Sequence, residues 1–150
     1  MSRFHEAARL RELLDMEAEV SAGMLELLKQ QTRLLEAGDA EELNKSLVES
    51  ARLMGKFDGL HQETEPLMQS YILYLGSDGA KEDKQLEAAW QRVTELLGEC
   101  SELNKKNVAE AKEGVQEYVR RIGSLSMKRE SLGRYAQPTG DNSAMFDKKQ

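Results

Sequence analysis

Apolar residues recur at steps of three and four along most of the chain, and this periodicity restricts the fold more than any other feature of the sequence. In the first third of the chain, leucine or valine returns every seven residues, at Leu13, Val20, Leu27 and Leu34. This spacing places apolar side chains on one face of an α-helix, with charged residues between them. The pattern predicts a helix from about Arg3 to Ala37.

A short turn separates this helix from the next one. Gly38 can adopt the left-handed conformation that ends helices. Asp39 can cap the following helix, with Glu42 three residues later to complete a capping box. So short a connection predicts that the second helix folds back antiparallel to the first.

The second helix is predicted from Ala40 to about Leu75. Its apolar face consists of ten residues at helical spacing: Leu43, Leu47, Ala51, Met54, Phe57, Leu60, Thr64, Leu67, Tyr71 and Leu75. Pro66 interrupts the pattern, and a proline inside a helix removes one hydrogen bond and clashes with the preceding turn. We therefore expect either a kink or a break just before Pro66.

After a turn at Gly76–Gly79, a third helix is predicted from about Ala80 to about Met127. Its face contains Leu86, Trp90, Val93, Leu97 and Cys100, then Asn104 and Asn107, and then Ala111, Val115, Tyr118, Ile122 and Leu125. From Ser131 onward, glycine and proline interrupt the periodicity, which predicts a flexible tail. The expected fold is all-α: an elongated antiparallel arrangement of a long helical hairpin and a longer third helix, with a helical domain at 1–130 and a tail at 131–150.

The composition agrees with long helices exposed over much of their surface. Apolar residues make up 39% of the chain and charged residues 32%. The net charge of −6 argues against a general nucleic-acid binder, because the phosphate backbone favours basic surfaces. We find no signal peptide, and the run Tyr71–Leu75 is too short to span a bilayer. We expect a cytoplasmic protein, in which the single Cys100 is a packing residue.

The sequence lacks a recognisable catalytic or metal-binding motif. His5 and His61 lie on different predicted helices and have no neighbouring cysteine at ligand spacing. No glycine-rich loop precedes a lysine, as a phosphate-binding loop requires. Carboxylate pairs such as Glu41 and Glu42 are typical of helix starts. We therefore expect neither an enzyme nor a bound cofactor or metal.

The predicted lengths leave the end of the third helix without a partner. The first two helices span about 35 residues each, so we expect the third to run past the turn at Gly38 near residue 116. The apolar residues beyond this point would be exposed: Tyr118, Val119, Ile122 and Leu125. An unpaired apolar stripe is typical of a protein-binding surface. A homodimer or a bend that buries the stripe is the alternative.

Asn104 and Asn107 lie three residues apart on the same predicted face. A buried asparagine can fix the register of packed helices or hold the backbone of a partner. The alternative is that both face solvent, because a straight helix drifts away from a strict heptad.

The chain resembles the FlgN family of flagellar export chaperones. The similarity lies in Ala89–Val93, in Glu102–Asn107 with its Leu-Asn-x-x-Asn pattern, in Tyr135 within a glycine-containing tail, and in the turn Glu36–Asp39. It covers most of the chain in layout and short patches in identity.

This resemblance implies a cytoplasmic chaperone of type III flagellar export. Its partners would be hook-filament junction proteins, whose C-terminal amphipathic segments it binds, together with the export gate membrane protein and the export ATPase complex. The resemblance also implies gate docking through Tyr135. We expect client contacts from Asn104, Asn107, Val108, Val115, Tyr118, Val119, Ile122 and Leu125. The alternative is a structural coiled-coil subunit, such as a stalk-like component of the export ATPase complex.

Overall fold

The computed structural model describes the backbone of residues 4–135 and the side chains of residues 4–124. Three helices occur in this part of the chain, and no strand occurs there: α1 (Ala7–Ala37), α2 (Ala40–Leu75) and α3 (Lys84–Tyr135). The predicted all-α, three-helix fold is confirmed. The chain forms two compact units, residues 1–109 and residues 110–150, and α3 contributes to both.

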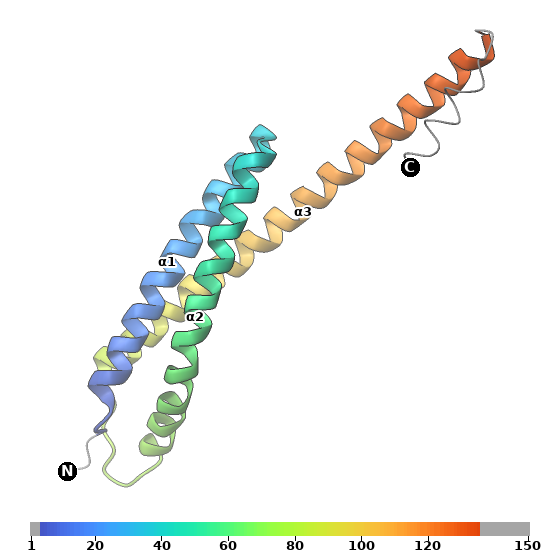
Figure 1. Cartoon of the computed structure of the whole chain (residues 1–150). Helices are drawn as coiled ribbons and strands as arrows, with labels where there is room; N and C mark the ends of the chain where they lie inside the picture. The colour runs from blue at the N-terminus through green and yellow to red at the C-terminus, as the bar shows by residue number, and fades with distance from the viewer. Residues whose placement is uncertain (1–3, 136–150) are drawn as a thin grey trace. The chain divides into compact units, whose positions relative to one another are not determined.

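The turn between α1 and α2 has the predicted chemistry. Gly38 has φ 70°, in the left-handed region. At the end of α1, the Gly38 N–H donates to the Leu35 carbonyl and the Asp39 N–H to the Leu34 carbonyl. The Asp39 carboxylate caps α2 by accepting from the Glu42 N–H at 3.2 Å. The Glu42 carboxylate pairs with Lys45 rather than completing a capping box. The two helices run antiparallel, side by side (Figure 1), as so short a turn requires.

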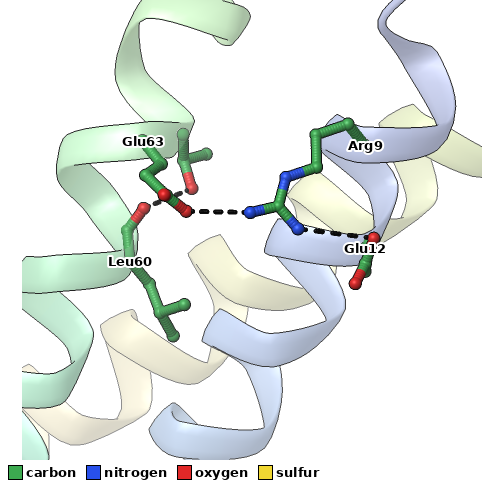
Figure 2. A network of polar contacts seen from close by, with 5 residues as sticks. Arg9, Glu12, Leu60 and Glu63 are labelled. Atoms are coloured by element: carbon green, nitrogen blue, oxygen red, sulfur yellow. Dashed lines mark hydrogen bonds and ion pairs between the residues drawn. The ribbon is translucent and has the colours of Figure 1, made fainter.

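Surface ion pairs accompany this antiparallel packing. Figure 2 shows the Arg9 guanidinium between two carboxylates, Glu12 on α1 and Glu63 on α2, at N–O distances of 3.4 and 3.1 Å. All three side chains are at least half exposed, so we assign each pair no more than about 1 kcal/mol. The helices are therefore held mainly by their apolar faces.

The core of the first unit lies where all three helices meet. Its buried members come from α1, α2 and the start of α3: Leu10, Leu14, Ala18, Tyr71, Leu86 and Val93. The Tyr71 hydroxyl accepts from the Asp83 N–H at 2.9 Å and donates to Glu87 at 3.2 Å. Burial is the main cause of the raised pKa of this phenol. Tyr71 thus ties the end of α2 to the start of α3.

The first part of α3 runs parallel to α1, which completes an up-down-up order. Contacts advance together along both helices, from Arg11 with Gln85, through Ser21 with Cys100, to Leu28 with Asn107. Pro66 lies inside one uninterrupted α2, so the predicted alternative of a break is wrong. The helix continues because Pro66 removes only one of its many backbone bonds.

Two helix boundaries differ from the prediction. α3 begins at Lys84. Asp83 is its N-terminal cap, because the Asp83 carboxylate accepts a hydrogen bond from the Leu86 N–H at 3.0 Å. It ends at Tyr135, eight residues beyond the predicted end at Met127. Residues 131–135, expected to open the tail, are therefore helical; Gly133 is tolerated there at a cost of about 1 kcal/mol. The remaining tail, 136–150, lies outside the described residues.

Some residues expected in the core are exposed. Leu47, Ala51 and Met54 on α2 and Trp90 on α3 belong to this group. Along α2 the contact with α1 passes instead through Ser46 and Ser50, which bind Gln31. Leu47 and Met54 lie beside that line of contact. A periodic stripe wider than the interface thus leaves some of its members in solvent.

A candidate protein-binding surface on the third helix

One face of α3 is buried in the first unit and exposed in the second. Leu86, Val93, Cys100 and Asn107 are seven residues apart and all buried. The same helical face continues after Asn107 in steps of three or four. Its members in the second unit, called the α3 stripe from here on, are Val115, Tyr118, Val119 and Ile122. Val93 is 4% exposed, whereas Val115 and Val119 are 62% and 60% exposed.

Helix lengths account for this change. Among the residues with described side chains, Thr32 is the last α1 residue with a side-chain hydrogen bond to α3, and its hydroxyl donates to Asn107 at 2.7 Å. Only five residues of α1 follow Thr32, whereas 28 residues of α3 follow Asn107. We expected the apolar residues after residue 116 to lack partners within the chain, and the exposure of Tyr118, Val119 and Ile122 agrees with this expectation. Four exposed apolar side chains on consecutive turns form a surface of the kind that binds other proteins.

The two asparagines have different environments. Asn107 is buried: its amide donates to the Leu28 carbonyl at 3.0 Å and its oxygen accepts from Thr32. Asn104 is exposed. Asn107 therefore fixes the register of α3 on α1, whereas Asn104 faces solvent. That Asn107 also contacts a client remains a prediction, but in the free chain its amide is engaged by α1.

Side-chain hydrogen bonds join α1 and α2 at this end of the first unit, close in sequence to the buried Leu28. The Gln31 amide donates to Ser46 at 3.2 Å and to Ser50 at 2.7 Å, and the Ser46 hydroxyl donates to Gln30. Buried polar groups of this kind specify one alignment, because misaligned partners would be left unsatisfied. We found no signal in the sequence that distinguishes these serines from surface serines.

Cys100 is a packing residue, as predicted. It is buried, and its thiol donates to the Ser21 carbonyl at 3.5 Å. Burial, assisted by the charge of Glu99, raises the pKa of the thiol. A raised pKa disfavours the reactive thiolate near neutral pH.

His61 contacts protein side chains on both α1 and α2. Its Nδ1 lies 3.4 Å from the buried carboxylate of Glu17, and its ring stacks on Phe57. His61 thus belongs to the α1–α2 interface. Among the residues with described side chains, we find no group of three histidine, cysteine or acidic residues arranged to hold a metal ion.

Two further surface features are not predicted by the sequence pattern. Leu47, Val48 and Met54 are exposed apolar residues of α2. A groove between α1 and α3 is lined by Leu25, Gly98 and Leu103, with lysines and glutamates around it. Both depend on which part of a helix face a neighbour covers, and periodicity alone does not indicate this.

The remaining predicted site residues are placed only in part. Val108 is exposed, near the end of the first unit. Leu125 and Tyr135 lie on α3, and Tyr135 is its last residue, but their side chains are outside the described set. Within residues 4–135, no helix has both the length and the apolar composition that a bilayer-spanning segment requires.

A comparison with protein families gives a match over most of the chain. The family model described as FlgN protein matches residues 1–132, and thus both the helical hairpin and nearly all of α3. No curated protein and no solved structure matches the chain. The match extends over more than half of the sequence and includes the α3 stripe. The chain belongs to the FlgN family, a family of flagellar export chaperones rather than of enzymes.

Proposed function

We propose that the protein is a cytoplasmic chaperone that binds the C-terminal helical segments of hook-filament junction proteins on the α3 stripe and delivers them to the type III export gate. Family membership supports the general role. The observation that carries the binding site is the exposure of Val115, Tyr118, Val119 and Ile122 on the face that is buried earlier in α3.

The physical reason for such a chaperone is the insolubility of a lone amphipathic segment. An apolar helix face in water favours aggregation, and a second helix that covers this face removes it from solvent. Helix-against-helix packing uses apolar anchors at spacings of three and four, which is the spacing of the α3 stripe. Because this contact is non-covalent, the client can be released intact at the gate.

Leu125 extends the proposed client surface along α3, and for Asn104 and Val108 of the first unit we also propose client contacts. Asn107 fixes α3 on α1. For Tyr135 we propose gate docking, on the basis of the family resemblance. Its position at the end of α3 separates it by thirteen residues from Ile122. Client binding and gate docking would then use different parts of one helix.

Replacing Val115, Val119 and Ile122 together with aspartate tests the proposed client surface. Each substitution would place a charge where an apolar contact forms in the complex, and burying an unpaired charge is strongly unfavourable. We expect client binding, measured with a purified C-terminal client segment, to be lost. The melting temperature of the free chain should change little, because all three side chains are exposed there.

A matched control makes the same change in net charge on the opposite face. Ala109→Asp, Arg120→Gln and Ser124→Asp alter three exposed residues of the same helix, none of them three or four residues from a member of the α3 stripe. This control should retain client affinity. Undiminished binding by the stripe variant would overturn the proposed site, and collapse of its fold would show that the stripe is core. Tyr135→Ala should keep client affinity and reduce export.

A further inference from the structure

The two units differ in the sign of their net charge. Residues 1–109 contain 13 lysines and arginines against 21 aspartates and glutamates, a net charge of −8. Residues 110–150 contain eight against six, a net charge of +2. An anionic partner is therefore repelled by the field of the first unit but not by that of the second. Charge favours its approach to the unit that carries the α3 stripe.

Among residues 110–124 of the second unit, the charged residues nearest to the α3 stripe are cations. Lys112 precedes Val115 by three residues and Val119 by seven, so it borders the stripe on one side. Arg121 follows Tyr118 by three residues and borders it on the other side. Both side chains are exposed.

The carboxylates of this segment lie on the opposite face of the helix. Glu113 and Glu117 are four residues apart, and their neighbours at three or four residues are polar or small: Ala109, Glu110, Gln116, Gly114, Arg120 and Arg121. A helix laid on the α3 stripe would thus meet Lys112 and Arg121 before it met any carboxylate of this segment.

Existing ion pairs leave these cations available to a partner. Arg121 Nε lies 3.5 Å from Glu117 Oε1, and both side chains are at least half exposed, so the pair is weak. Arg120 makes a shorter contact with the same carboxylate, at 3.1 Å. Among the residues with described side chains, Lys112 has no ion-pair partner.

We infer that the client segment is an amphipathic helix with aspartate or glutamate along the edges of its apolar face, placed to meet Lys112 and Arg121. The inference rests on the proposed function, since it assumes that a helical client lies on the α3 stripe. Apolar contact alone does not distinguish one amphipathic helix from another. Charges along the edges provide that discrimination and repel segments with basic edges.

Two synthetic helical peptides test this inference against the full-length chain. They share all apolar residues, and one has glutamate and the other lysine along both edges. At low salt, fluorescence anisotropy should show the glutamate peptide binding about tenfold more tightly, since each exposed pair contributes modestly. The advantage should shrink in about 1 M salt, where the Debye length falls to about 3 Å. Equal affinities, or tighter binding of the lysine peptide, would overturn the inference.

Arg120 and Arg121 form a matched pair of test sites. They are adjacent, similarly exposed and bonded to the same Glu117, but only Arg121 borders the α3 stripe. Arg121→Glu should weaken the glutamate peptide about fivefold, and Arg120→Glu less than about twofold. Equal weakening by both would show that only overall charge matters, and would overturn the inference.

Two further measurements separate the possible failures. If the chain binds phosphatidylglycerol vesicles tightly and does not discriminate between the peptides, the cations serve a membrane surface and the inference is overturned. The triple aspartate variant of the α3 stripe distinguishes the two proposals. If wild type binds both peptides equally and the triple variant binds neither, the inference fails and the proposed function stands. If the triple variant binds both as wild type does, the proposed function itself fails.

Discussion

The two parts of α3 follow the same sequence pattern and differ in what covers them. Before Glu110, the repeating face of the helix packs on α1 and α2 and buries Leu86, Val93 and Cys100. From Glu110 to Ser124, residues at the same spacing are exposed, apart from the half-buried Ala111. Periodicity therefore specifies a helix and its apolar face in both parts. Whether that face is core or binding surface depends on the neighbouring helices, and α1 ends at Ala37.

The largest effect that we expect separates two valines on this shared face. Val93→Asp should lower the free energy of unfolding by about 3 kcal/mol or more, because it buries a charge without a partner. Val115→Asp should change it by no more than about 0.5 kcal/mol, because Val115 is exposed. Urea denaturation measures both. Similar losses in the two variants would contradict the distinction between the two parts of α3.

Replacing each of the two asparagines compares a buried with an exposed position again, with a smaller expected effect. Asn107→Ala removes the bonds to Leu28 and Thr32 and should cost about 1–3 kcal/mol of unfolding free energy. Asn104→Ala should cost less than about 0.5 kcal/mol, since Asn104 is exposed. Both costs can be measured from the midpoints of urea denaturation curves, provided that the dependence of the unfolding free energy on urea concentration has the same slope in each variant. An equal cost at both positions would argue that Asn107 does not fix the register.

The smallest effect concerns the buried titratable groups of the first unit. Burial raises the pKa values of Cys100 and Tyr71 in the folded chain, so both hold their protons more tightly there. Their contribution to stability is complete below the unfolded pKa values of about 8.5 and 10. It is lost as the pH rises through the higher folded values. Stability should therefore fall with increasing pH above about 8.5, and Cys100→Ala should remove the first part of this decrease. An unchanged pH profile in this variant would exclude Cys100 as its source.

Much of the fold could be predicted because local signals agreed with the periodic pattern. Gly38 and Asp39 adopt the turn and cap conformations that their residue types favour. Trp90 and Leu47 were wrongly expected in the core because they lie at helical spacing yet outside the line of contact. Neighbouring helices determine that line. The end of α3 was placed too early because Gly133 only weakens a helix.

The candidate site was predictable to a lesser degree. Comparison of helix lengths identified Tyr118, Val119 and Ile122, whose exposure agrees with the overhang, and the periodic pattern added Val115. Spacing could not separate Asn107 from Asn104, since both lie on the same face. Only the positions of Thr32 and Leu28 on α1 show which amide finds hydrogen-bond partners. Lys112 and Arg121 can be identified as charges at the edges of the binding face only once the exposed face is known.

A single exposed thiol on the α3 stripe provides the most direct test of the central claim. Cys100 is the only cysteine and is buried with a raised pKa, so it contributes little background labelling. Val119→Cys should react with a thiol reagent at close to the rate of an unstructured peptide in the free chain, and much more slowly with client bound. Glu113→Cys, on the opposite face, should react rapidly in both states. Slow labelling of Val119→Cys without client, or equal labelling of the two variants with client bound, would contradict the account.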